Sequence, residues 1–197
     1  GLAETKDFRG QPTPAIIYPH QISVDFDDLL LNALLELWRS RMNRGEHGAF
    51  RRKVYRSLEL AYQALRAPYV QLGSQTDHGV TLSLWVSAFE TLAHPGVEQV
   101  KFNHVSDLLK RVPWHASKLR RALSRPIDRR MHVPGRPQQP LPNTTRAVQI
   151  YGRLYRSRNR VLHGDALPRK GIEVGKRKVW GPLEVQVPVL YRSLLLH

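Results

Sequence analysis

Residues 151–165 read YGRLYRSRNRVLHGD and predict an amphipathic helix. On a helix of about 3.6 residues per turn, the apolar residues of this segment and of the few residues before it share one face. That face consists of Ala147, Ile150, Tyr151, Leu154, Val161 and Leu162. The opposite face carries His163 and three arginines, Arg153, Arg156 and Arg160. We expect this helix to follow Asn143-Thr144-Thr145 and to end at Gly164, because glycine commonly ends helices.

Arg158 is the exception on this helix, because it falls within the apolar arc. A guanidinium among apolar side chains is costly unless a carboxylate neutralises it. Glu90 is the best candidate partner, since it is the acidic residue within an otherwise apolar segment that we expect to be helical over 77–93. We therefore predict an ion pair between Arg158 and Glu90.

The rest of the chain predicts an all-α fold, a helical bundle in which the segment 77–93 is central because it is apolar on nearly all sides. Apolar residues also recur at helical spacing in four other segments, which are 23–45, 47–67, 97–112 and 185–196. We expect a single helical domain over 23–197, preceded by an extended arm over 1–22 that has three prolines and no helical period. Residues 170–180 are expected to form a small hairpin.

A proline-rich connection over 126–142 interrupts the helices. Because proline lacks an amide N–H, we expect neither a helix nor a central strand there. Four arginines make the connection a basic loop: Arg125, Arg129, Arg130 and Arg136. Such a loop is suited to closing over phosphates, and the alternative is a solvated connection without a ligand.

Positive charge is concentrated in the second half of the chain. Residues 101–197 carry 21 basic and 5 acidic residues, whereas residues 1–100 carry 10 and 11. A concentrated positive field is expected of proteins that bind polyanions, and arginine, which outnumbers lysine by 23 to 8, matches phosphate in a bidentate way. The distribution favours a nucleic-acid partner over charge that serves solubility or an anionic lipid surface.

Residue types that the chain lacks exclude several classes of functional site. The 197-residue chain has no cysteine, which excludes disulfides, thiolate metal sites and cysteine nucleophiles. Clustered carboxylates and histidine pairs with metal-ligand spacing are also absent, so we expect no metal and no cofactor. The charged N-terminal residues do not resemble a signal peptide, and no apolar run is long enough to cross a bilayer. We expect a cytoplasmic protein.

The combination of histidine and arginine on the 151–165 helix is suited to the cleavage of RNA. RNA supplies its own nucleophile, the 2′-hydroxyl, and the protein must then add a group that moves a proton and positive charge for the developing phosphorane. Histidine can move a proton near neutral pH, and the arginine fork fits the non-bridging oxygens. His163 and Arg158 are the candidates for these two tasks.

The same residues resemble the signature of the HEPN superfamily, in particular its Apea-like branch. The matching positions are Leu154, Tyr155, Arg158, Asn159, Val161, Leu162, His163 and Gly164. Domains of that branch are helical bundles in which arginine, usually followed by a polar residue, precedes histidine by a few positions. The upstream segment 84–92, LWVSAFETL, is similar to the earlier, glutamate-bearing helix of that branch. The motif-bearing core would span 77–197.

This resemblance implies a metal-independent endoribonuclease that acts as a homodimer, with the motifs of two protomers facing each other. By position, Arg158 and His163 would be catalytic, Asn159 would orient them, and Glu90 would buttress Arg158. Such proteins often act in toxin–antitoxin or antiphage systems. The implied partners are therefore RNA and an antitoxin or regulatory protein.

Other residues are expected to support the site or to hold the nucleic acid. We expect Tyr155 and Asp165 to support the site, and eight arginines to contact phosphates: Arg120, Arg121, Arg125, Arg129, Arg130, Arg153, Arg156 and Arg160. Trp114 could stack on a base, or it could belong to the core. Two alternatives to the nuclease stay open, a non-catalytic RNA- or DNA-binding module and a regulatory interaction domain, in which His163 caps its helix and Arg158 makes a structural ion pair.

Overall fold

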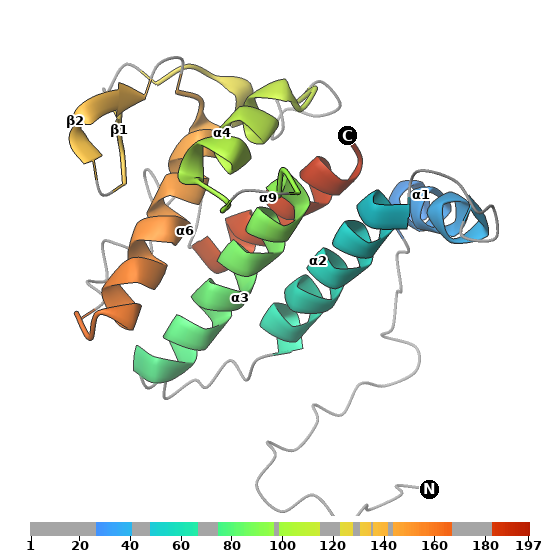
Figure 1. The fold of residues 1–197 in the computed structure, drawn as a ribbon, viewed down its shortest axis with the longest axis horizontal. Helices are drawn as coiled ribbons and strands as arrows, with labels where there is room; N and C mark the ends of the chain where they lie inside the picture. Colours follow the sequence, from blue (N-terminus) through green and yellow to red (C-terminus); the bar gives the residue numbers. More distant parts are fainter. Residues whose placement is uncertain are drawn as a thin grey trace, which may run out of the picture.

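Helices account for most of the structure, as the sequence predicts, and an antiparallel hairpin is added to them (Figure 1). The computed structural model describes residues 27–40, 48–66, 75–96, 99–114, 123–127, 131–134, 136–141, 144–166 and 183–197. Its helices are α1 (Asp28–Arg39), α2 (Gly48–Arg66), α3 (Gln75–Ala93), α4 (Phe102–Arg111), α6 (Arg146–Leu162) and α9 (Leu183–Leu195). The predicted arm over 1–22 and the predicted hairpin over 170–180 lie outside the described residues.

Helix α3 is central, which confirms the prediction from its apolar sequence. It packs against α2, α4 and α6, and Figure 1 shows it between α2 and α6. Its side chains Trp85, Val86, Ala88 and Phe89 are buried on several sides of the helix. Because a helix that is apolar all round can be covered only by neighbours on several sides, this sequence requires the central position.

The boundaries of the remaining helices are close to those expected. Helix α4 begins later than predicted, at Phe102 instead of residue 97. Helix α9 begins at Leu183, two residues before the expected 185, and it therefore contains Pro188 in its interior. Thr145 is the N-cap of α6, and its side chain accepts a hydrogen bond from the amide of Val148.

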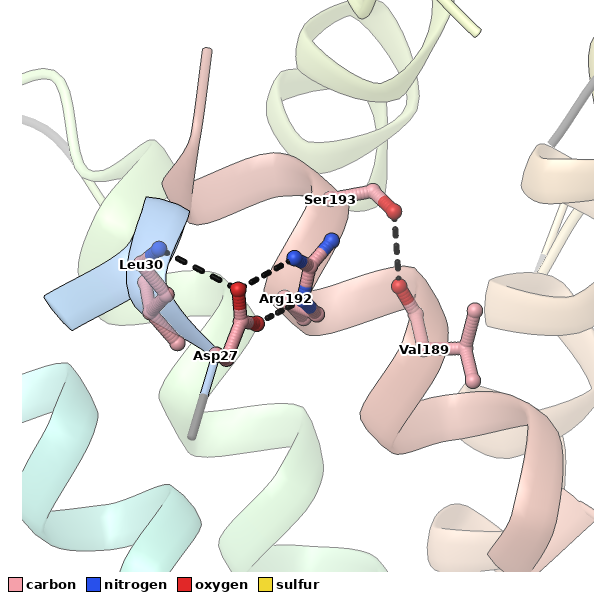
Figure 2. A network of polar contacts seen from close by, with 5 residues as sticks. All are labelled: Asp27, Leu30, Val189, Arg192 and Ser193. Atoms are coloured by element: carbon pink, nitrogen blue, oxygen red, sulfur yellow. Dashed lines mark hydrogen bonds and ion pairs between the residues drawn. The ribbon is translucent and has the colours of Figure 1, made fainter. Parts of the chain in front are cut away.

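Helix α1 packs less closely than the other helices. None of its residues is buried, and the apolar side chains of Leu29 and Trp38 are 60% and 53% exposed. It begins after Asp27, whose carboxylate caps the helix by accepting from the amide of Leu30 at 3.2 Å. The same carboxylate forms an ion pair with Arg192 of α9. Figure 2 shows Asp27 between these two groups.

The proline-rich connection contains a hairpin, so the expectation of a loop was wrong, although neither strand is a central strand. Strand β1 (Met131–Val133) pairs with β2 (Arg136–Leu141) in an antiparallel ribbon with an irregularity between His132 and Val133. Both strands of a two-stranded ribbon are edge strands, so prolines can occupy positions whose amide needs no partner. The residues before and after the hairpin lie side by side just before α6, where the amide of Ile127 donates a hydrogen bond to the carbonyl of Thr144 at 2.9 Å.

Within the residues described above, no helix is long and apolar enough to cross a membrane.

Candidate functional site

The ends of α3 and α6 approach each other closely at one side of the bundle. A β-carbon added to Gly79 of α3 would lie 2.2 Å from Cγ1 of Val161 on α6, well inside contact distance. Glycine therefore lets the first turns of α3 meet the last turns of α6. Sequence reasoning did not identify Gly79, although a glycine within an apolar helical segment is a signal of close packing.

The last turn of α6 determines where His163 lies. Gly164 has a φ angle of +78°, in the left-handed region that favours glycine. The amide of Asp165 donates to the carbonyl of Arg160 at 2.8 Å, and the amide of Gly164 donates to that of Val161 at 3.0 Å. This pair of bonds is the Schellman motif, in which His163 is the C-cap residue. His163 is thereby held at the exposed end of the helix. The sequence predicts this helix end, because it places the end of the helix at Gly164.

Arg158 points from α6 to α3, and the expected ion pair with Glu90 is present. Its Nη2 lies 3.9 Å from Oε2 of Glu90, and both side chains are about three-quarters buried, with exposed fractions of 23% and 22%. The adjacent Nη1 donates a hydrogen bond to Oδ1 of Asn159 at 3.0 Å. At 3.9 Å the contact with Glu90 is an ion pair but not a hydrogen bond.

Aromatic rings form the inner wall beside this ion pair. The guanidinium carbon of Arg158 lies 5.6 Å from the centre of the Tyr155 ring, within range of a cation–π interaction. Tyr155 contacts Phe102 of α4 edge-on, and Phe102 stacks on Tyr151 at 5.3 Å between ring centres. The half-buried Tyr155 ring therefore packs against Arg158.

The surroundings disfavour negative charge on the nearby acidic groups. Burial raises the pKa of the Glu90 carboxyl, and the Arg158 guanidinium offsets this only in part. Burial also raises the pKa of the Tyr151 hydroxyl well above its usual range, and the charge of Glu90 adds to that effect. Tyr151 is consequently a neutral phenol. Its hydroxyl is buried and has no hydrogen-bond partner among the residues described.

Arg158 retains donor capacity that its neighbours do not use. A guanidinium has five N–H donors, and the described hydrogen bonds of Arg158 consist of the one to Asn159. Its Nε is buried and without a partner in the described part of the chain, and Glu90 is too distant to accept a hydrogen bond. A guanidinium in this state can donate from its exposed N–H groups to a phosphate oxygen without first losing a strong bond to a carboxylate.

The side chain of His163 makes no described contact with Arg158 or Glu90 within one chain. His163 lies five positions after Arg158, so the two side chains leave α6 about 140° apart and about 7.5 Å apart along its axis. His163 is exposed, and its imidazole has no hydrogen bond to any residue of the described ranges. Asp165, which we expected to support the site, is also exposed and contributes its backbone amide to the helix end.

Apolar side chains border the exposed end of α6. Val80 and Leu162 follow directly after Gly79 and Val161, whose close contact joins α3 to α6. They are 52% and 62% exposed. The apolar face predicted for α6 is thus correct for Ala147, Ile150, Tyr151 and Leu154, which are buried, and wrong for Leu162.

The arginines expected to bind phosphates fall into two groups. Arg156 and Arg160 are exposed on α6, Arg153 is half-buried there, and Arg125 is exposed before the hairpin. The others lie outside the described residues, and they are Arg120, Arg121, Arg129 and Arg130.

Trp114 is a core residue, which is the second of the two alternatives that its sequence left open. It is 3% exposed, and its indole Nε1 donates to the carbonyl of Leu109 at 3.2 Å. A tryptophan whose only polar atom is bonded internally has no free face to offer a nucleotide.

No group of three or more histidine, aspartate or glutamate side chains that could hold a metal ion occurs within the described ranges. Comparison with known proteins finds no family model, no curated protein and no solved structure that matches this chain.

Proposed function

We propose that this protein is a metal-independent endoribonuclease of HEPN type, with Arg158 and His163 as its catalytic residues. The observation that carries the proposal is the state of Arg158, which is fixed by Asn159 and Tyr155 while its bond to Glu90 stays long. An arginine that serves only to neutralise a buried carboxylate would be expected to donate directly to it. Arg158 instead keeps donors for a ligand.

In the proposed reaction, the 2′-oxygen of the RNA attacks the adjacent phosphorus and the bond to the 5′-oxygen breaks. The 2′-hydroxyl loses a proton and the leaving 5′-oxygen gains one; His163 carries out one of these two transfers, and solvent water takes or supplies the other proton. Arg158 binds the non-bridging oxygens, on which negative charge grows in the phosphorane. The products are a 2′,3′-cyclic phosphate and a free 5′-hydroxyl, and no water is consumed.

The two residues act across a homodimer in this proposal. Within one chain Arg158 faces α3 while His163 is exposed at the end of α6. The exposed Val80 and Leu162 beside that end supply apolar surface for contact with a second copy. Arg156 and Arg160, on the exposed side of the same helix, would then follow the RNA backbone.

The test uses purified protein and mixed RNA in excess chelator. Wild-type protein is expected to release fragments with a cyclic phosphate and a 5′-hydroxyl, and Arg158→Ala and His163→Ala are each expected to lower the rate by about 100-fold or more. Arg111→Ala and His197→Ala are matched controls, since both residues are exposed and lie outside the proposed site. RNA that stays intact with wild-type protein would contradict the proposal.

Mixing the two inactive variants tests the homodimer. If Arg158 of one protomer works with His163 of the other, mixed dimers of Arg158→Ala and His163→Ala contain one complete site and recover part of the cleavage rate. Recovery that requires both variants supports the composite site. Equal inactivity of the mixture and of its components, with exchange of subunits shown by mass, would place the chemistry within one chain.

The second candidate function is a non-catalytic RNA- or DNA-binding module. The observation that favours it is the absence of any described contact between His163 and Arg158. This alternative predicts nucleic-acid binding that weakens on Arg160→Glu while RNA remains uncut. In the nuclease, the same substitution weakens binding and slows cleavage together.

A further inference from the structure

An apolar cavity of about 370 Å³ lies on the side of the bundle formed by α1, α2, α3 and α9, and it is separate from the Arg158 cluster. This volume is within the range of small-molecule sites. Its wall is formed by Leu30 of α1, Trp85 of α3, and side chains of α2 and α9. The α2 and α9 residues are Leu58, Ala61, Tyr62, Leu65, Pro188, Val189, Tyr191, Arg192 and Leu195.

The body of any ligand in this cavity has to be apolar. The wall consists almost wholly of aliphatic and aromatic carbon. The Tyr191 hydroxyl is already bonded to the Ser57 hydroxyl at 2.6 Å, and Ser57 Oγ also lies 2.7 Å from the carbonyl of Ala88. A polar group on the body of a ligand would therefore stay without a partner and would cost binding free energy.

The rim of the cavity, by contrast, is positively charged. Arg192 is part of the wall, and Arg66 lies over the ring of Tyr62, with its guanidinium carbon 5.4 Å from the ring centre. The Arg192 fork donates from Nε to one oxygen of Asp27 and from Nη2 to the other, as Figure 2 shows. This edge of the cavity thus already binds a carboxylate, in the bidentate geometry that arginine prefers.

Asp27 can be displaced more readily than a core residue. It lies at the start of α1, a helix with no buried residue, and the Asp27 and Arg192 side chains are 32% and 29% exposed. At this degree of exposure water competes with both partners, so the net stability of the pair is modest even though its geometry is bidentate. A carboxylate anchored by apolar contacts in the cavity would compete with Asp27 on favourable terms.

From these contacts we propose that the cavity binds a small aliphatic carboxylate, whose chain fills the apolar volume and whose carboxylate replaces Asp27 on Arg192. Binding frees the start of α1 from α9, since the Asp27 carboxylate then keeps only its bond from the amide of Leu30, and the Asp27 carbonyl keeps its bond from the amide of Leu31. The ligand and α1 are coupled through one guanidinium.

The experiment titrates the full chain with octanoate and with octanol by calorimetry. Octanoate is expected to bind about tenfold more tightly than octanol, which has the same chain but no charge to place on Arg192. Arg192→Gln should abolish this difference and leave octanol unaffected. No binding of octanoate, or equal affinities for the two ligands in the wild type, overturns the proposal.

Asp27→Asn is the sharpest variant, because asparagine remains a good N-cap but cannot hold the guanidinium as an ion pair. Without the competitor, octanoate should bind roughly two- to fivefold more tightly, and octanol should bind unchanged. A weaker affinity for octanoate in this variant would show that Asp27 helps to bind the ligand, and it would overturn the competition.

Substitution of two exposed leucines tests where octanoate binds. Leu65→Glu places a carboxylate at the cavity wall and should weaken octanoate binding by about tenfold or more, whereas Leu35→Glu on α1, outside the wall, should not. Equal effects of the two variants overturn the assignment. Sedimentation velocity is run on the same proteins, since a dimer that Leu65→Glu dissociates and octanoate does not affect would mean that a second copy occupies the cavity instead.

Discussion

The Asp27–Arg192 pair and the Glu90–Arg158 pair join the same two kinds of side chain in different parts of the molecule, and they differ in both geometry and electrostatics. Arg192 reaches both oxygens of Asp27, whereas Arg158 approaches one oxygen of Glu90 at 3.9 Å. The hydrogen bonds from Arg192 lower the pKa of the Asp27 carboxyl. Burial raises the pKa of the Glu90 carboxyl despite its arginine.

The difference lies in what surrounds each arginine. Asp27 and Arg192 meet at the surface, where water solvates the charges and the side chains are free to align. Glu90 and Arg158 project from two packed helices, so α3 and α6 determine how closely they can approach. The comparison indicates that Arg192 is hydrogen-bonded to both oxygens of a carboxylate that another carboxylate could replace. Arg158 is held in place by its neighbours, and some of its N–H donors have no acceptor among the described residues.

The largest expected effect concerns the arginine forks. Arg158→Lys should reduce RNA cleavage by about 100-fold or more, because an ammonium group cannot bind two non-bridging oxygens in a plane. Arg192→Lys should leave the cleavage rate within about twofold of the wild type, because Arg192 pairs with Asp27 and lies outside the proposed catalytic site. Initial rates on a fluorogenic RNA in chelator measure both effects. Similar losses in the two variants would mean that the pairs do not differ in function.

A second comparison uses two helical glycines, Gly79 of α3 and Gly48 of α2. Gly79→Ala places a β-carbon against Val161 of α6, and we expect a net loss of about 1–2 kcal/mol in the free energy of unfolding after the gain in helix propensity. Gly48→Ala, at the start of α2, has its nearest atoms at 3.8 Å and should be neutral or stabilising by less than about 1 kcal/mol. Urea denaturation followed by circular dichroism tests the pair, and Val161→Ala should recover part of the Gly79→Ala loss.

The smallest effects concern pH, and the two carboxylates should act in opposite directions. Glu90 has a folded-state pKa above its usual 4.5, so its contribution to stability is full below that pH and is lost as pH rises through the raised pKa. Asp27 has a folded-state pKa below its usual 3.8, so its contribution is present above pH 3.8 and is lost as pH falls through the lowered value. Free energies of unfolding measured against pH should lose the first dependence in Glu90→Gln and the second in Asp27→Asn. Slopes of the same sign would contradict this assignment.

Much of the candidate site follows from local sequence. The Thr145 cap, the helix over Arg146–Leu162 and the end at Gly164 depend on residues close in the chain, so periodicity and capping rules locate them. The Arg158–Glu90 pair is a long-range contact that could still be predicted, because a lone guanidinium and a lone carboxylate on apolar faces need each other.

Other features depend on how the helices are arranged. The helical spacing of apolar residues predicted α1, but that spacing does not show that none of its residues is buried. The sequence also left open whether Trp114 stacks on a base or belongs to the core, and the packing at the end of α4 places its ring in the core. The Asp27–Arg192 pair was not predicted, because the two residues lie at opposite ends of the chain and either could have remained solvated.

Local chemistry was enough to indicate which segments are helical, where α6 ends and which arginine needs a carboxylate, because those properties depend on spacing and on the cost of burying charge. The distance between Arg158 and Glu90, the exposed position of His163 and the cavity beside Arg192 arise only when α3, α6 and α9 pack together. Packing sets separations of a few ångströms between residues far apart in the chain, and a pattern of residue types does not encode separations on that scale.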